Sequence, residues 1–179
     1  MAETSINASR LRLTPFTDSH LTEIYIGWLN NKELMRYSEQ RHIDHTVISC
    51  QRYLESFEGS DNYFWAIEEK MSNKHIGNIT AYIDRNNNLA NLSLLIGDDS
   101  AHGKGYGHEA WGAALKWLLN DFMVRKIIAG TMEENKAMLK IMQHSGMNIE
   151  GTFENHYLLN GTQVDIIFMS IFSSKQLGS

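Results

Sequence analysis

A glycine-rich stretch at residues 101–110 constrains the fold more than any other segment of this chain. An apolar, strand-like run at 92–96 precedes it, and a helix-like pattern follows it. Glycines in the turn let the backbone direct N–H groups toward an anion, and the first turn of a following helix supplies more unpaired N–H groups. The stretch therefore predicts either a phosphate-binding loop or a plain tight turn that joins a strand to a helix.

Two common phosphate-binding motifs do not describe this stretch. The P-loop pattern GxxxxGK[ST] does not occur in the sequence. The dinucleotide fingerprint GxGxxG lies in a βαβ unit, whereas Gly103, Gly105 and Gly107 are spaced GxGxG and follow several strand-like segments. A nucleotide-dependent oxidoreductase is therefore the least favoured class of protein.

The first half of the chain predicts two helices and an antiparallel meander. Asp18 and Asp44 are each expected to cap a helix that carries an apolar stripe. Strand-like runs at 63–67, 76–83 and 89–96 are separated by short turn-rich segments. Strands within hairpin distance of one another are expected to pair in antiparallel fashion.

The second half predicts a crossover and a terminal hairpin. A β-rich run at 124–131 follows the helix after the glycine-rich stretch, so the strands on either side of that helix should be parallel. A further helix is expected at 135–145. Asn160-Gly161 divides the segment 148–172 and is a strong hairpin signal. The whole pattern predicts one α/β domain built on a mixed sheet.

The segment His-Gly-Lys-Gly-Tyr-Gly-His-Glu-Ala that begins at His102 resembles the pyrophosphate-binding signature [QR]-x-x-G-x-[GA] of the GCN5-related N-acetyltransferases, the GNAT superfamily. Gly105 and Gly107 fill the two small positions, while His102 replaces the usual Gln or Arg. Residues 134–147 resemble a helix of the branch that contains the ribosomal-protein alanine N-acetyltransferases. The resemblance covers 10–173 and implies a single N-acetyltransferase domain with the GNAT fold.

The GNAT fold implied by the resemblance has a central mixed, mostly antiparallel twisted sheet flanked by about four helices, with a βαβ crossover and a C-terminal β-hairpin. The resemblance also implies acetyl-CoA as co-substrate, with its pantetheine arm along a strand that splays from its neighbour. Here that strand is 89–96, and a bulge is expected to expose its backbone. The implied cofactor-binding residues are Leu94, Leu95, Ile96, His102, Gly103, Lys104, Gly105, Tyr106, Gly107 and Asn135.

The usual acid and base of the family are replaced in this sequence. Asn91 lies where relatives often carry a glutamate base, and Met142 lies where others carry a tyrosine acid. We therefore predict Asn91 as the catalytic position, with the amine losing its proton either to bulk water or to a water held by Asn91. His108 is a weaker candidate, because a cation is disfavoured at the start of a helix.

The polar linker 35–42 is predicted to form one wall of the acceptor site, or alternatively a solvated surface loop. Tyr37 can stack on a ring, and Arg41 can pair with phosphate or carboxylate, as Arg36 also can. These residues favour direct transfer, in a ternary complex, to the primary amine of a small molecule such as a nucleotide-linked amino sugar. The alternatives are an N-terminal acetyltransferase of a (ribosomal) protein and a catalytically weak CoA-binding module.

Composition limits the remaining possibilities. A net charge of −5 argues against a broad nucleic-acid surface, and no apolar run approaches the length of a membrane span. Cys50 is the single cysteine, so no internal disulfide can form and the cytoplasm is the default location. Cys50 lies on an apolar stripe and is expected in the core. His42 and His45 lack a third partner, so no metal is expected. A monomer or a homodimer is expected.

Overall fold

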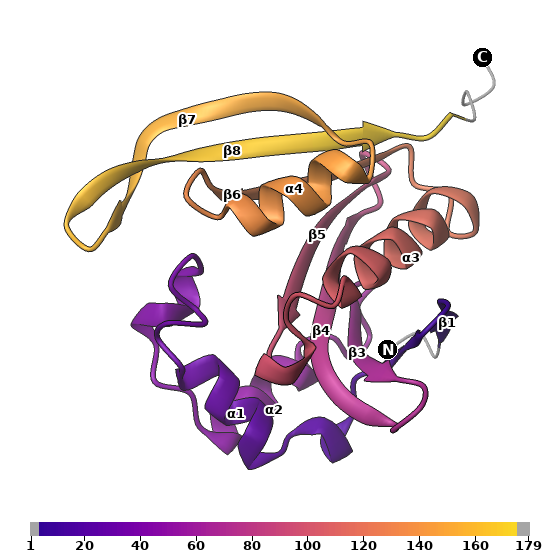
Figure 1. Cartoon of the computed structure of the whole chain (residues 1–179). Helices are drawn as coiled ribbons and strands as arrows, with labels where there is room; N and C mark the ends of the chain where they lie inside the picture. Colours follow the sequence, from indigo (N-terminus) through magenta and orange to yellow (C-terminus); the bar gives the residue numbers. More distant parts are fainter. Residues whose placement is uncertain (1–3, 175–179) are drawn as a thin grey trace.

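The computed structural model describes residues 4–174, which form one eight-stranded sheet in the order β1-β2-β3-β4-β5-β6-β8-β7 (Figure 1). All neighbouring strands are antiparallel except β5 and β6, which are parallel. The strands are β1 (Ile6–Asn7), β2 (Leu11–Pro15), β3 (Tyr63–Glu69), β4 (Lys74–Asp84), β5 (Leu89–Ile96), β6 (Lys126–Met132), β7 (Asn148–Leu159) and β8 (Thr162–Phe172). The α-helices are α1 (Glu23–Asn30), α2 (Val47–Glu55), α3 (Tyr106–Asn120) and α4 (Lys136–His144). The predicted fold class is confirmed.

Helices cover both faces of the central strands, and the sequence of β3 shows why. Its alternate residues Tyr63, Trp65 and Ile67 pack in the same core cluster as α3, which includes Trp111. Phe64, between them, packs on the opposite face with the residues of α1 and α2. A strand buried on both faces reads as a continuous apolar run, because its side chains alternate between two cores.

The strands β5 and β6 separate soon after they meet. They pair only from Leu89 to Asn91 on β5 and from Lys126 to Ile128 on β6. Beyond this point β6 continues its ladder with β8, while β5 continues its ladder with β4 as far as Ile96. Both strands therefore keep one hydrogen-bonded neighbour while a gap opens between them. The β4–β5 register is regular throughout, so the predicted bulge in β5 is wrong.

The first two helices begin at other residues than predicted, because threonines rather than the predicted aspartates cap them. Thr22 caps α1 by accepting from the Tyr25 N–H at 3.2 Å, and Thr46 caps α2 by accepting from the Ser49 N–H at 3.1 Å. Asp18 instead begins the short 3-10 turn η1 (Asp18–His20). The linker between the two helices contains a second 3-10 turn, η2 (Glu39–His42), and a third, η3 (Asp99–Ala101), precedes the glycine loop.

The predicted hairpin near the C-terminus is confirmed, and one strand near the N-terminus was not predicted. Asn160 and Gly161 have φ values of 51° and 82°, as a two-residue hairpin turn requires, and they join β7 to β8. The register of that hairpin shifts between Phe153 and Tyr157. The two-residue strand β1 was not predicted. It is too short to show a sequence period, and it exists because it pairs with β2.

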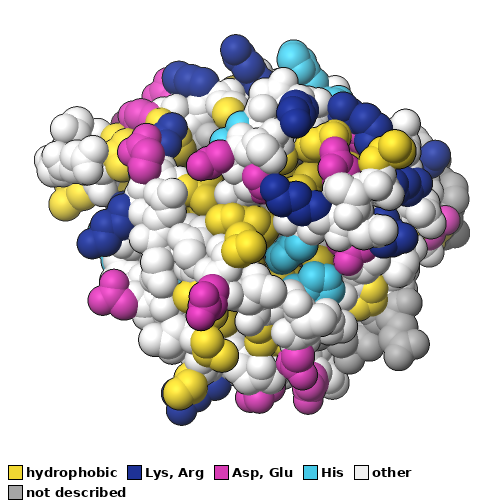
Figure 2. All heavy atoms as spheres, turned by 60° about the horizontal axis from the view of Figure 1, so that its bottom comes forward, with side chains coloured by type: hydrophobic (Ala, Val, Ile, Leu, Met, Phe, Trp, Pro, Cys, Tyr) yellow, Lys and Arg dark blue, Asp and Glu magenta, His cyan; other side chains and the backbone are white. Residues whose placement is uncertain are grey.

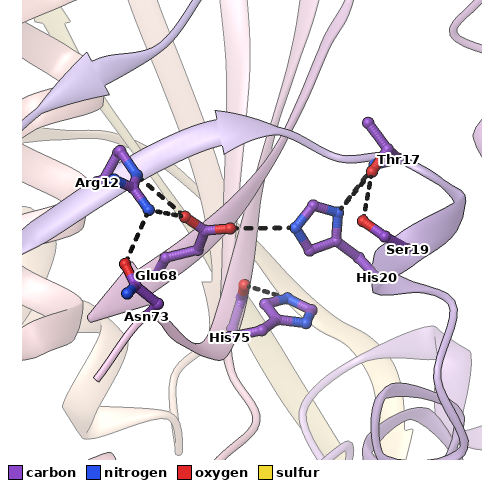
Figure 3. Close-up of polar contacts among 8 residues, drawn as sticks. Arg12, Thr17, Ser19, His20, Glu68, Asn73 and His75 are labelled. Atoms are coloured by element: carbon purple, nitrogen blue, oxygen red, sulfur yellow. Dashed lines mark hydrogen bonds and ion pairs between the residues drawn. The ribbon is translucent and has the colours of Figure 1, made fainter. Parts of the chain in front are cut away.

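A cluster of polar side chains lies on the face of the sheet that α1 and α2 cover, which is the face opposite α3 (Figure 3). Arg12 Nη2 lies 2.7 Å from Glu68 Oε2, and His20 Nε2 lies 3.3 Å from Glu68 Oε1. His75 Nε2 donates to the Gly77 carbonyl at 2.9 Å, and its ring centroid lies 5.1 Å from that of His20. Burial, with a smaller contribution from the charge of His20, lowers the pKa of His75 to about 4.

We predict that His75 makes the fold sensitive to acid. Its folded pKa of about 4 lies below the unfolded value of 6.5, so the unfolded chain binds more protons between these pH values. The free energy of unfolding should therefore fall as the pH is lowered from 6.5 to about 4, by roughly 3 kcal/mol in total. Urea denaturation across this range should show a smaller fall for His75→Gln, while the exposed control His42→Gln should follow the wild type. The same fall in the free energy of unfolding for all three proteins would contradict the prediction.

Candidate functional site

A cavity of about 1300 Å³ occupies the gap between β5 and β6 and extends toward the α1–α2 linker. One end is bounded by the glycine loop (102–107). The middle is bounded by 92–96 of β5 and 129–131 of β6, and the far end by the linker and α2. In Figure 2, which brings the α1–α2 side forward, histidine and hydrophobic side chains lie together near the centre of the face. One connected volume therefore reaches from the glycine loop to the α1–α2 linker and α2.

The glycine loop has the backbone conformation that its sequence predicted. Gly103 and Gly105 have φ values of 72° and 78°, in the left-handed region that favours glycine, and Gly105 is the N-cap of α3. Gly107 has a different reason to be small. A Cβ there would lie 3.2 Å from Ile141 Cδ1 of α4, so the residue allows α3 and α4 to approach each other. The first-turn residues of the 15-residue helix α3, whose N–H groups have no partner within the helix, are among those that line the cavity.

Arg10 fixes the glycine loop to the sheet, a role that no motif indicated. Its Nη1 donates to the Lys104 carbonyl at 3.0 Å, and its Nε donates to Glu109 Oε2 at 2.7 Å. Its guanidinium also lies 4.5 Å from the ring centroid of Tyr106, whose hydroxyl donates to Glu69. The Lys104 side chain is exposed and is absent from the cavity lining, so only its backbone is part of this brace.

The backbone of β5 presents alternate residues to the gap. The Gly97 N–H donates to the Ile76 carbonyl in register with the β4–β5 ladder. Because hydrogen-bonding direction alternates along an antiparallel strand, Leu95 pairs with β4, while Leu94 and Ile96 direct their backbone groups toward the gap. His102 Nε2 donates to the Ile96 carbonyl at 2.8 Å, so this imidazole closes the end of the open edge.

Asn135 connects β6 to α4 at the edge of the cavity. Its Oδ1 accepts from the Met138 N–H at 3.2 Å, and its Nδ2 donates to Thr131 Oγ1 at 3.0 Å. Met142 lies fully buried in the core, so a thioether occupies the place of the expected tyrosine. Asn135 lines the cavity and stays a predicted cofactor contact.

The candidates for proton transfer, Asn91 and His108, lie at different places relative to the cavity. Asn91 is exposed and lies opposite Tyr82 in the β4–β5 ladder, outside the cavity lining. Ser93, two residues further on the same face, does line the cavity. His108 borders the cavity near the start of α3, with its ring 6.2 Å from that of His144. The catalytic role of Asn91 stays a prediction.

Some linker residues line the cavity, whereas Arg41 ties the linker to β7. Tyr37 and Arg36 line the cavity, and the Arg36 guanidinium lies 4.6 Å from the Tyr37 ring centroid. Arg41, the other predicted acceptor-binding residue, is outside the lining. Its side chain is 11% exposed and donates to the carbonyls of Ser38 and Leu158, which ties η2 to β7. The role of Arg41 in binding the acceptor substrate stays a prediction, and its guanidinium is already hydrogen-bonded to these carbonyls in this structure.

Three further expectations concern metal binding, membrane crossing and the single cysteine. His45 lines the cavity and His42 does not, and residues 4–174 contain no group of three His, Cys, Asp or Glu side chains placed to hold a metal ion. Within the same residues, no helix is both long enough and apolar enough to cross a bilayer. Cys50 is buried as predicted, and burial raises the pKa of its thiol.

Comparison with known proteins identifies the family. A family model described as Acetyltransferase (GNAT) domain matches residues 10–148. The chain therefore belongs to the GNAT acetyltransferase family, and it is an N-acetyltransferase. No curated protein matches the sequence significantly. The predicted domain, 10–173, extends beyond the matched residues through the terminal hairpin.

Solved structures share the fold at low sequence identity. Spermidine N-acetyltransferase from Vibrio cholerae, in complex with CoA and spermine, is 20% identical with a TM-score of 0.83, over 94% of this chain and 99% of that one. Ribosomal-protein-S5-alanine acetyltransferase from Vibrio fischeri is 19% identical with a TM-score of 0.81, over 96% and 97%. The microcin C7 self-immunity acetyltransferase, in complex with acetyl-CoA and AMP, is 17% identical with a TM-score of 0.77, over 92% and 93%.

We predict that Gly105→Val weakens acetyl-CoA binding by roughly tenfold or more, because a β-branched residue in the left-handed region costs about 1–2 kcal/mol and displaces the first N–H groups of α3. Calorimetry on the folded variant measures the effect. Gly112→Ala in the same helix is the matched control, since a Cβ there would meet no atom within 4 Å. An unchanged affinity in Gly105→Val would place the phosphate site elsewhere.

Proposed function

We propose that this N-acetyltransferase moves the acetyl group of acetyl-CoA to a primary amine on a hydroxylated, anionic small molecule, such as a nucleotide-linked amino sugar. The observation that carries the proposal is the set of polar, mostly uncharged side chains that lie among apolar ones at the acceptor end of the cavity, with Arg36 and Tyr37 beside them. A ternary complex is supported because one connected cavity borders both the glycine loop and these side chains.

The residues at the donor end fit acetyl-CoA. The left-handed glycines and the first turn of α3 offer N–H groups to a pyrophosphate. The open edge of β5, at Leu94 and Ile96, offers backbone groups to the amides of a pantetheine arm, as an added strand would use them. When bound, acetyl-CoA supplies an activated acyl carbon. The family relationship and the solved neighbours that hold CoA or acetyl-CoA support this donor.

Unpaired polar atoms at the acceptor end favour a ligand with hydroxyl groups. His45 and Asn78 are among the residues that line the cavity, and their buried atoms His45 Nε2 and Asn78 Oδ1 have no hydrogen-bond partner in the described chain. Buried polar groups left without a partner cost about 1–3 kcal/mol each, so a ligand that pairs with them gains affinity. The hydroxyls of a sugar ring can donate to Asn78 and can donate to or accept from His45.

Charge at the acceptor end disfavours a polyamine. A polycation is best held by several carboxylates, and Glu134 is the one carboxylate residue among the described residues that line the cavity. The neighbouring spermidine acetyltransferase, solved with spermine, is thus a model of the fold rather than of the acceptor. Arg36 Nη1 is paired with Glu33 Oε1 at 2.7 Å, so the other N–H groups of its guanidinium are the ones that can pair with phosphate. The flat Tyr37 ring beside it can stack on a base or sugar.

Direct attack fits the side chains that border the gap. Cys50 lines the cavity, but burial raises the pKa of its thiol, so it stays protonated and is a poor acyl carrier. As the amine attacks, the carbonyl oxygen gains negative charge. The backbone N–H of Leu94 faces the gap and is placed to donate to that oxygen. Asn91, on the same strand, is proposed to hold a water that takes part in removing the amine proton.

The proposal is tested with purified protein, acetyl-CoA and a panel of amines: a UDP-linked sugar with a primary amine, spermidine, and a peptide with an N-terminal alanine. Thiol release and mass spectrometry of the products give kcat/KM for each. The sugar is expected to exceed the other two by at least about tenfold. Preference for the peptide would favour protein N-terminal acetylation, and acetyl-CoA binding without turnover would favour a binding module.

We predict that Arg36→Ala and Tyr37→Ala each raise the KM of the acceptor by roughly tenfold while the Kd of acetyl-CoA changes by less than about threefold. The reason is that both side chains border the acceptor end and lie away from the glycine loop. Steady-state kinetics and calorimetry measure the two quantities. Lys32→Ala, an exposed change in the same linker, should match the wild type.

Arg41→Ala provides a contrast to these variants. Because Arg41 ties η2 to β7, we expect its loss to raise the acceptor KM together with a lower melting temperature. Wild-type KM values in Arg36→Ala and Tyr37→Ala would show that the linker is a scaffold, and the anionic acceptor would then lose its support.

A further inference from the structure

A carboxylate without a partner lies in the wall of the cavity, at the turn between β6 and α4. Glu134 is half-buried and lines the cavity, and its Oε2 atom is buried with no hydrogen-bond partner among residues 4–174. No Lys, Arg or His in that part of the chain forms an ion pair with it. A buried carboxylate oxygen is costly to leave unpaired. A cation that enters the cavity can supply the partner.

The turn directs two neighbouring glutamates to different sides. The Asn135 N–H donates to the Met132 carbonyl at 3.0 Å. Glu133 and Glu134 are therefore the two central residues of a tight turn. Glu134 lines the main cavity, whereas Glu133 is exposed and lines a separate groove beside α4. Of the two, Glu134 is the one that can meet a ligand in the cavity.

The position of Glu134 is fixed by its neighbours on either side. Asn135 and Thr131, joined by a hydrogen bond of 3.0 Å, border the middle of the cavity. Met132 belongs to the apolar cluster against which Tyr37 of the α1–α2 linker packs (Figure 1). Glu134 is thus placed where the acceptor end of the cavity meets the gap between β5 and β6.

The nearest charges of the cavity wall do not neutralise this carboxylate. Lys136 Nζ pairs with Glu133 Oε1 at 3.3 Å. Arg36 Nη1 pairs with Glu33 Oε1 at 2.7 Å. Glu134 is also the one carboxylate residue among the described residues that line the cavity. One carboxylate matches one ammonium group, and a ligand with several cations would leave the others without a partner.

We propose that Glu134 binds the ammonium group of the acceptor and makes the enzyme selective for an amine that carries one positive charge. The inference rests on the proposed amine acetylation and narrows the acceptor to a monoamine. An ammonium has three N–H donors, so it can pair with Glu134 and still donate to other polar groups or to water. A hydroxyl in the same place lacks the charge that strengthens this hydrogen bond.

Glu134 acts at the binding step, before the acetyl group moves. The bound ammonium loses one proton to water, and the neutral nitrogen then forms the C–N bond with the acetyl carbon. The C–S bond breaks, and the second amine proton neutralises the leaving thiolate. One proton in total reaches solvent, and the Glu134 carboxylate is unchanged at the end.

The test combines Glu134→Gln with a change in the charge of the ligand. The UDP-linked amino sugar is compared with the UDP-linked sugar that has a hydroxyl in place of the amine. The alanine peptide is compared with the same peptide carrying an N-terminal lactyl group. Calorimetry in the presence of CoA gives a Kd for each protein and ligand. The wild type should bind the amine roughly 10- to 100-fold more tightly than its hydroxyl analogue, and Glu134→Gln should bind the two within about threefold.

Kinetics distinguish a residue that binds the ammonium from a proton acceptor. Glu134→Gln should raise the acceptor KM by roughly 10- to 100-fold, while kcat and the Kd of acetyl-CoA stay within about threefold. Glu134→Asp keeps the charge and should keep part of the preference for the amine. Glu133→Gln is the matched control, because it removes the neighbouring charge outside the main cavity, and it should match the wild type. Melting temperatures check that the variants are folded.

Other outcomes would overturn the inference. Equal affinity of the wild type for an amine and its hydroxyl analogue would show that no carboxylate recognises the charge. A preference for the amine that persists in Glu134→Gln, or is lost equally in Glu133→Gln, would place the ammonium elsewhere. A large fall in kcat with an unchanged KM would make Glu134 a proton acceptor instead. A preference for spermidine over the other amines would contradict selectivity for one charge. Failure of the sugar alone contradicts the proposed acceptor, and Glu134 is then measured with the peptide pair.

Discussion

The separation of β5 from β6 is the constraint on which the rest of the structure depends. A backbone edge inside a protein must find hydrogen-bond partners, and here each strand keeps one partner, β4 or β8, while the other side stays open. The gap is therefore stable without closing. It directs backbone groups of β5, such as those of Leu94, into the gap, where an extended ligand could pair with them.

The glycine loop depends on the same gap, because it must lie where the open edge of β5 ends. Arg10 holds it there through the Lys104 carbonyl and Glu109, and Gly107 lets α4 approach α3. A loop that wraps an anion loses less entropy on binding when it is already fixed. The brace thus links the start of β2, at one side of the sheet, to the donor end of the cavity.

The acceptor end is the part of the cavity bordered by the α1–α2 linker, α2, β4 and β5. Its polar groups include hydroxyls, the Asn78 amide and the His45 imidazole, and burial raises the pKa values of Tyr53 and of the Cys50 thiol. Under the proposed function, the scarcity of carboxylates here disfavours a polycation, and the hydrogen-bonding groups would meet sugar hydroxyls.

The sequence by itself determined most of the elements, though not β1 or the first residues of α1 and α2, because their signals are local: apolar periods, the glycine spacing of 103–107, and Asn160-Gly161 at the hairpin. It also predicted the crossover and the family. Only the tertiary structure decided that Arg10 braces the loop, that Arg41 ties the linker to β7, and that Ser93 meets Thr80. These contacts depend on strand register and on residues far apart in the chain, and no local pattern encodes such distances.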